Sequence, residues 1–112
     1  MNAMPNLDII CKKVVEAYQK IYGDKIRGIY LYGSYARGDF NEDSDIDFAA
    51  IVNGERLDLQ NKRYQLWDYT NDMDLNYDVL ISPRVIPADE FDKYFPELPY
   101  YQNILKEGKQ LA

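Results

Sequence analysis

Two aspartates, Asp45 and Asp47, stand one residue apart at the head of the apolar run DIDFAAIV. Side chains alternate between the two faces of a strand, so we expect both carboxylates on the same face. Like charges held this close repel each other, and burial without a counter-charge drives one of the two groups to take up a proton. A divalent cation removes the conflict, because Mg²⁺ binds through one or two carboxylates together with substrate phosphates. The pair therefore indicates a metal platform, with two solvated turn acids as the simpler alternative.

A third acid, Asp78, lies within the segment LNYDVLIS at 75–82, which we predict to be a strand. If this strand pairs with 45–52, Asp78 can reach the same cation. Three acids on neighbouring strands can hold two Mg²⁺ ions for in-line phosphoryl transfer. Asp74 is the alternative ligand if the strand register is shifted by several residues. Alone, Asp78 can also be a charge that protects an edge strand from aggregation.

The segment YGSYARGD directly follows a predicted strand and has the residues of a phosphate-binding turn. Gly33 allows a sharp turn and a close approach of the backbone to a ligand. Ser34 offers a hydroxyl and a backbone N–H, and a short helix beginning here would present its free N–H groups to an anion. Arg37 can neutralise a triphosphate or pair with a carboxylate of the same site. The spacing matches neither a Walker P-loop nor a dinucleotide-binding fingerprint.

The two motifs together carry more information than either one. Gly33 and Ser34, ten intervening residues, and Asp45-x-Asp47, with strands on both sides, resemble the signature of the DNA polymerase β-like nucleotidyltransferases. Within that superfamily the chain looks like the minimal nucleotidyltransferase domains. The resemblance implies that Gly33 and Ser34 contact the triphosphate of ATP, and that Asp45 and Asp47 are metal ligands. Tyr35 departs from the family pattern, in which many members carry a basic residue.

The resemblance also extends beyond the central motif, loosely over residues 7–111. The letters YDVLI stand where the family keeps its third carboxylate, so the resemblance implies that Asp78 is the third ligand of two Mg²⁺ ions and helps to activate the acceptor hydroxyl. Arg37 matches a frequent arginine of the family motif. The tail NILKEGKQLA is similar to the closing helix of the family.

The function implied by the resemblance is transfer of AMP from ATP to a hydroxyl, with release of pyrophosphate. Minimal nucleotidyltransferases are often encoded beside HEPN-type toxins, so the expected acceptor is a tyrosine of such a toxin and the expected role is that of an antitoxin. The alternatives are a non-catalytic antitoxin that acts by binding, and a transferase for a small-molecule alcohol. Because 112 residues leave little material for a base pocket and an acceptor groove, we expect another subunit or a partner protein to complete the site.

Composition narrows the class of protein further. With 46% hydrophobic and 29% charged residues, the chain is expected to form a single globular domain over residues 1–112. A net charge of −6 argues against nucleic-acid binding and against polymerisation. The absence of histidine excludes Ser-His and Cys-His catalysis and most zinc sites. The single cysteine, Cys11, excludes an internal disulfide and fits a cytoplasmic location. We expect no membrane span and no signal peptide.

The elements that must position these residues follow from hydrophobic periodicity and turn residues. The order predicts an α/β fold of the α+β type, in which a mixed sheet of about three strands is covered by helices, and the resemblance specifies the polymerase β-like nucleotidyltransferase fold. The expected elements are a helix over 7–21 that Pro5 begins and Gly23 ends, strands at 26–32 and 45–52, a helix over 55–69, a turn at 71–74, a strand at 75–82, a loop marked by Pro83 and Pro87, and helices at 88–94 and 98–106.

Overall fold

The computed structural model describes residues 6–112, so the predicted role of Pro5 lies outside the described residues. The helices are α1 (Leu7–Tyr22), η1 (Gly23–Lys25, a 3₁₀ turn), α2 (Ser34–Arg37), α3 (Arg56–Asn61), α4 (Arg63–Tyr77), α5 (Ala88–Tyr94) and α6 (Pro99–Glu107). The strands are β1 (Ile26–Tyr32), β2 (Ile46–Val52), β3 (Ile81–Pro87) and β4 (Lys109–Gln110). None of the helices described has the length and apolar content needed to cross a membrane.

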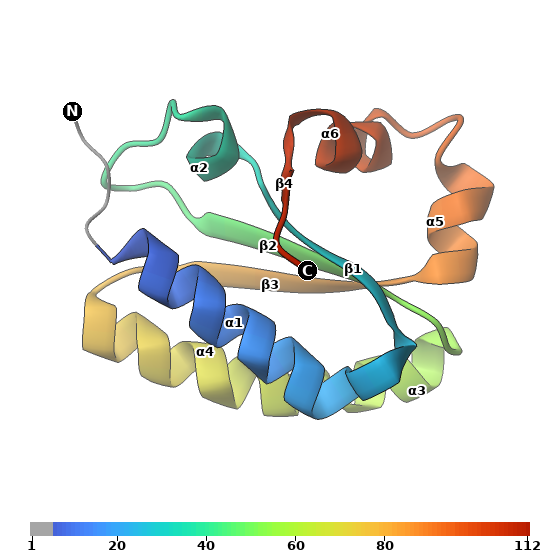
Figure 1. The fold of residues 1–112 in the computed structure, drawn as a ribbon, viewed down its shortest axis with the longest axis horizontal. Helices are drawn as coiled ribbons and strands as arrows, with labels where there is room; N and C mark the ends of the chain where they lie inside the picture. Colours follow the sequence, from blue (N-terminus) through green and yellow to red (C-terminus); the bar gives the residue numbers. More distant parts are fainter. Residues whose placement is uncertain (1–5) are drawn as a thin grey trace.

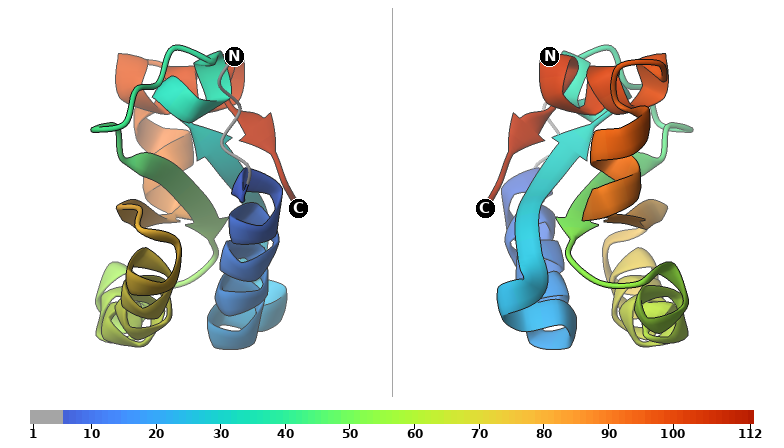
Figure 2. Two further views of the ribbon diagram at one scale, coloured as in Figure 1. Left: turned by 90° about the vertical axis from the view of Figure 1, so that its left-hand side faces the viewer. Right: turned by 90° about the vertical axis from the view of Figure 1, so that its right-hand side faces the viewer.

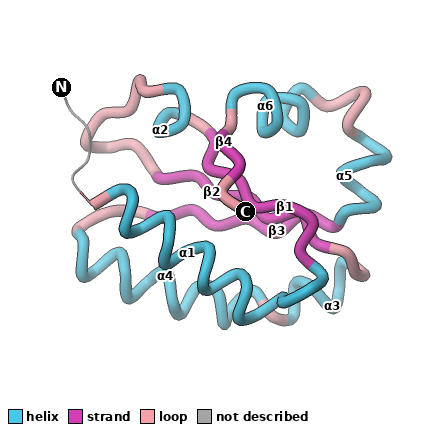
Figure 3. Tube along the Cα trace, viewed as in Figure 1, coloured by secondary structure: helices cyan, strands magenta, loops and turns pink. Residues whose placement is uncertain are grey.

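The strands form one mixed sheet in the order β3-β2-β1-β4. β1 pairs antiparallel with β2 and with β4, whereas β2 and β3 are parallel and are connected through α3 and α4. The mixed sheet with packed helices is therefore confirmed. The short β4, which lies beside β1 in Figure 3, was not predicted because two residues give no periodic signal.

Helices cover both faces of the sheet, as Figures 1 and 2 show, with α1, α3 and α4 on one face, α5 and α6 on the other, and α2 at the end of β1. The alternation predicted for β2 is confirmed, because Ile46, Phe48 and Ala50 join the larger core beneath α1 and α4. Ala49 and Ile51 join the smaller core beneath α5 and α6. Asp47 has the same parity as Ala49 and therefore belongs to the face that carries α5 and α6.

α4 is longer than predicted and continues through the expected turn at 71–74. The apolar and aromatic residues of α4 surround the helix: Leu66 and Met73 are buried, whereas Tyr64, Trp67 and Leu75 are exposed. A helix without a distinct polar face gives a weak periodic signal, so neither its length nor its end could be read from the pattern.

The third strand is β3 at Ile81–Pro87, and the predicted strand at 75–82 is wrong. Pro83 and Pro87, which indicated a loop, both lie in this strand. β3 is at the edge of the sheet, where the outward side of a strand needs no backbone donor, so proline is tolerated there.

Candidate active site

The two aspartates of the sequence motif lie together at the head of β2. Asp45 is exposed and directly precedes the strand, and Asp47 is half-buried within it. Burial raises the pKa of Asp47 above its ordinary value of 3.8, and the charge of Asp45 raises this pKa further, while Arg84 and Arg37 lower it. The expected conflict between the two like charges is therefore present, and a cation bound between them would relieve it.

The predicted phosphate turn lies against this pair. Gly33 follows β1 with a φ of 73°, and a Cβ atom at this position would collide with the Oδ2 of Asp47. The backbone N–H groups of Ala36 and Arg37 both donate to the carbonyl of Gly33 at 3.1 Å, which closes the turn tightly. The structure thus brings Gly33, Ser34, Asp45 and Asp47 together, as the motif predicted.

Tyr35 supports the loop that leads from α2 to Asp45. Its side chain is buried, and its ring stacks on Phe40 with centroids 4.2 Å apart and an interplanar angle of 8°. Further along the loop, the backbone N–H of Asn41 donates to the Oγ of Ser44 at 3.0 Å. An aromatic residue at position 35 therefore serves packing, which explains the departure from a basic residue.

Arg37 ends α2 and forms ion pairs with acids other than Asp45 and Asp47. Its Nε lies 3.2 Å from Asp39 Oδ2, and its Nη1 lies 3.6 Å from Glu107 Oε1 on α6. The charge of Arg37 lowers the pKa of Asp47, although it contacts neither carboxylate of the pair in the structure. Arg37 therefore links α2 to α6, and its guanidinium interacts with Asp39 and Glu107 instead of with the Asp45–Asp47 pair.

Asp78 is not on a strand. It caps the C-terminus of α4 with a left-handed backbone (φ 54°, ψ 53°), and its N–H donates to the carbonyl of Asp74. Its side chain is exposed and borders a hollow on the side of Tyr35 and Asp43. Within residues 6–112, no group of three or more His, Cys, Asp or Glu side chains is placed to hold a metal ion. The structure therefore does not bring Asp78 together with the pair, because α4 ends where the strand was expected.

Asp74, the alternative third ligand, is engaged in the backbone. Its Oδ1 accepts a hydrogen bond from the N–H of Ile81 at 2.9 Å. Burial raises the pKa of Asp74, the bond from Ile81 lowers it, and the charge of Asp45 raises it. Asp74 is thus close enough to Asp45 for the two charges to interact, while one of its oxygens fixes the start of β3.

The residue beside Asp47 on β3 is Ser82, and Arg84 follows it on the same face of the sheet. The donor set at the head of β2 is therefore two carboxylates with a neighbouring serine hydroxyl. This set fits one Mg²⁺ ion whose other ligands are phosphate and water oxygens. Among the described residues, no third carboxylate is placed with the pair to hold the second ion expected from the sequence.

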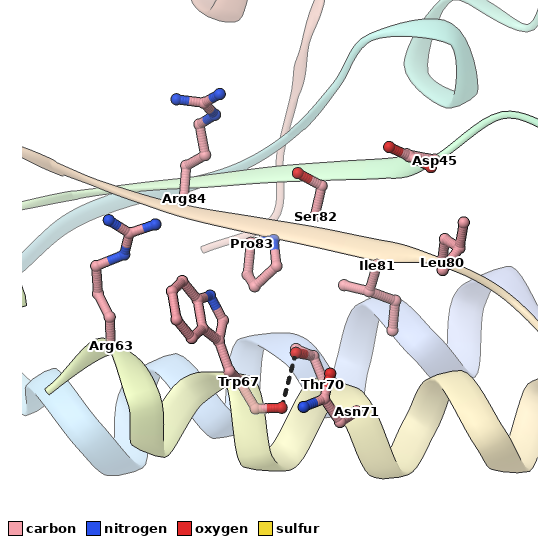
Figure 4. A pocket seen from close by; sticks show the side chains of 10 residues that line it. All are labelled: Asp45, Arg63, Trp67, Thr70, Asn71, Leu80, Ile81, Ser82, Pro83 and Arg84. Atoms are coloured by element: carbon pink, nitrogen blue, oxygen red, sulfur yellow. Dashed lines mark hydrogen bonds between the residues drawn. The ribbon is translucent and has the colours of Figure 1, made fainter.

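A cavity of about 480 Å³ adjoins Asp45 on the β3 side. Figure 4 shows Asp45 at one end of the cavity, the guanidinium groups of Arg63 and Arg84 at the other end, and Ser82 between them. Residues from α4 and from the β3 segment form its walls: Arg63, Trp67, Thr70, Asn71, Leu80, Ile81, Ser82, Pro83 and Arg84.

Four residues around the cavity were not predicted from the sequence: Ser82, Arg84, Arg63 and Trp67. The segment ISPRVIP does alternate over its first positions, which is a strand signal that the two prolines outweighed. For Arg63 and Trp67 the sequence holds no comparable signal, because their approach to Asp45 depends on how α4 packs beside β3.

Comparison with known proteins assigns the chain to a family. The profile of the nucleotidyltransferase domain family matches residues 11–111. A Methanocaldococcus jannaschii protein provisionally named protein adenylyltransferase MJ0604 is 35% identical over 100 residues, or 89% of this chain and 92% of that protein. A second protein of the same organism, provisionally named protein adenylyltransferase MJ0141, is 29% identical over 92 residues, which cover 82% of this chain and 91% of that protein. The chain belongs to the nucleotidyltransferase domain family and is a nucleotidyltransferase.

Solved structures with low sequence identity share the fold. A protein provisionally described as a minimal nucleotidyltransferase superposes with a TM-score of 0.56 at 18% identity, over 96% of this chain and 95% of the other. A chain of a toxin–antitoxin complex with AMP-PNP superposes with a TM-score of 0.58 at 21% identity. The superposition covers 91% of this chain and 72% of the other chain. The predicted minimal nucleotidyltransferase fold is thereby confirmed.

Proposed function

We propose that this protein is a Mg²⁺-dependent protein adenylyltransferase and an antitoxin, which transfers AMP from ATP to a tyrosine of a HEPN-type toxin. The observation that carries the proposal is the contact of the Gly33–Ser34 turn with Asp47, because it joins a phosphate-binding turn to a pair of carboxylates. The relatives named as protein adenylyltransferases and the toxin–antitoxin complex with AMP-PNP support ATP as donor and a protein as acceptor.

The residues of the chain divide the work between binding the cation and orienting the phosphates. Asp45 and Asp47 would hold Mg²⁺, which when bound supplies positive charge beside the α-phosphate. The hydroxyl of Ser34 and the backbone N–H groups of the turn orient the triphosphate. Positioning and charge neutralisation then account for most of the rate enhancement.

The reaction is a displacement at the α-phosphorus. The acceptor oxygen forms a bond to the α-phosphorus, and the bond from that atom to the bridging oxygen breaks. Pyrophosphate leaves with the electron pair, and the hydroxyl proton passes to solvent. No histidine is needed for this transfer, which is consistent with a chain that has none.

The proposal is tested with the protein encoded by the adjacent gene as acceptor. We expect ATP labelled at the α-phosphate to mark that protein in the presence of Mg²⁺, and ATP labelled at the γ-phosphate to leave it unmarked. The D45N/D47N double variant should label it at least about a hundredfold more slowly. Mass spectrometry of the labelled acceptor then identifies the modified residue, for which we expect a tyrosine.

The same variant separates an enzyme from a protein that acts by binding alone. If D45N/D47N binds the partner as tightly as the wild type but no longer neutralises it, neutralisation requires transfer. Full neutralisation without any label would contradict the proposal and favour the non-catalytic antitoxin.

A further inference from the structure

Two arginines in the cavity beside Asp45 have no acidic partner among residues 6–112. Arg27, Arg37 and Arg56 each form an ion pair, but Arg63 and Arg84 form none within that range. The guanidinium of Arg63 lies over the ring of Trp67, with Cζ 5.0 Å from the centroid, and its Nε–H is buried without an acceptor. A buried donor without a partner indicates a ligand group that the isolated chain does not supply.

The cavity lies on the side of the carboxylates opposite to the phosphate turn. In the sheet, Tyr32 of β1 is the neighbour of Asp47 on one side, and Gly33 follows it directly. Ser82 of β3 is the neighbour of Asp47 on the other side, and it borders the cavity. An in-line displacement requires the incoming oxygen and the leaving group to lie on opposite sides of the phosphorus. With the triphosphate on the turn, the acceptor therefore approaches from the cavity.

We infer that the cavity between α4 and β3 is the acceptor subsite, and that Arg63 and Arg84 bind carboxylates of an acidic protein segment beside its hydroxyl-bearing residue. The inference rests on the proposed function, since it assigns the acceptor side of the same site. The occupant is identified by charge, because two arginines without an acidic partner among the described residues flank the edge strand β3, Arg63 on the α4 side and Arg84 on the opposite side, in a chain whose net charge is −6. Arginine is also the residue best suited to bidentate recognition of carboxylates.

The walls of the cavity fit a polypeptide segment held by its side chains. β3 is an edge strand, but Pro83 has no N–H to offer, so recognition by strand addition is disfavoured. The apolar side chains of Trp67 and Leu80 are 45% and 62% exposed beside the cavity, where they can pack against the aliphatic or aromatic parts of an acceptor.

The test measures peptide binding without nucleotide, so that it does not depend on catalysis. The probe is a blocked, fluorescein-labelled peptide Glu-Glu-Tyr-Glu-Glu, compared with the same peptide carrying glutamine in place of glutamate. Anisotropy of the label gives the affinity, and Trp67, the single tryptophan of the chain, reports occupancy of the cavity by its fluorescence. The variants are Arg63→Gln and Arg84→Gln. Lys62→Gln is the control, because it removes the same charge from an exposed position next to the cavity.

We expect the wild type to bind the acidic peptide in preference to the glutamine peptide, and each arginine variant to bind the acidic peptide about tenfold more weakly. Lys62→Gln should bind it as the wild type does. Equal affinity for both peptides, or an equal loss in Lys62→Gln, would overturn the inference. Displacement of the acidic peptide by an equal concentration of inorganic pyrophosphate would assign the cavity to nucleotide phosphates and would also overturn it. Peptide binding without any AMP transfer to the partner protein would contradict the proposed function alone.

Discussion

The contact between Gly33 and Asp47 allows no side chain on the glycine. The φ of 73° already disfavours any L-residue, and a Cβ atom would push the Asp47 carboxylate away from the turn. Gly33 precedes the short helix α2, and Gly38 ends that helix with a φ of 88°. A Cβ atom at Gly38 would meet no other atom within 4 Å. A substitution at Gly38 therefore introduces backbone strain alone, whereas a substitution at Gly33 introduces backbone strain and also displaces the Asp47 carboxylate.

Gly33→Ala is expected to lose Mg²⁺-dependent nucleotide binding, because the methyl group displaces Asp47. Gly38→Ala should keep that binding. Each variant should lose about 1–2 kcal/mol of the free energy of unfolding through backbone strain. Urea unfolding measures the stability and calorimetry measures the binding. Equal nucleotide affinities of the two variants would show that the close approach of Gly33 is not needed.

Asp47 also predicts a pH dependence of stability in the absence of metal. Its pKa in the folded protein is raised above 3.8 by burial, so the folded state binds the proton more readily than the unfolded state. The ionised carboxylate therefore destabilises the fold above the raised pKa, and this loss disappears as the pH falls through the raised pKa to below 3.8.

Asp47→Asn should accordingly unfold at a higher urea concentration than the wild type at pH 7 with EDTA present. The difference should shrink as the pH is lowered to about 4. Asp43→Asn, which changes an exposed acid of the loop before β2, serves as the control and should follow the wild type. A stability difference that stays constant or grows on acidification would contradict the assignment.

At the scale of the elements, the helices and strands with strong local sequence patterns could be predicted from the sequence. α1 has a regular apolar stripe, and β1 and β2 are short β-branched or aromatic runs, so all three were predicted close to their observed bounds. Four of the candidate site residues, Gly33, Ser34, Asp45 and Asp47, follow directly from β1 and β2 and are brought together as expected.

The third candidate carboxylate could not be placed in this way because it depends on where α4 ends. The alternation of Tyr77, Val79 and Ile81 looks like a strand, but the helix continues to Tyr77 and Asp78 takes the left-handed cap position. The register of β3 against β2 is a tertiary property. It brings Ser82 beside Asp47, and no local pattern encodes that pairing.

The cap position of Asp78 predicts the effect of replacing it. Glycine adopts a left-handed backbone without strain, so Asp78→Gly should raise the free energy of unfolding by about 0.5–1 kcal/mol. AMP transfer and Mg²⁺ affinity should be unchanged, because the side chain is exposed and apart from the pair. A stably folded Asp78→Gly variant without transfer activity would make Asp78 a ligand after all.

At the scale of the whole molecule, the small sheet carries the residues of the proposed active site. The phosphate turn and the carboxylates come from β1, α2 and β2, and an open cavity with unpaired arginines adjoins them at the β3 edge. We propose that the acceptor protein completes the enclosure, which would explain how a chain of 112 residues can serve as a transferase.

The central claim is that Asp45 and Asp47 form the metal-nucleotide site, and calorimetry with α,β-methylene-ATP tests it most directly, since its α–β bridge resists transfer. The wild type should bind this nucleotide with Mg²⁺ and far more weakly with EDTA. D45N/D47N should show no detectable binding, whereas the matched loop variant E42Q/D43N, with the same loss of charge, should bind as the wild type does. Equally tight Mg²⁺-dependent binding by D45N/D47N would contradict the account.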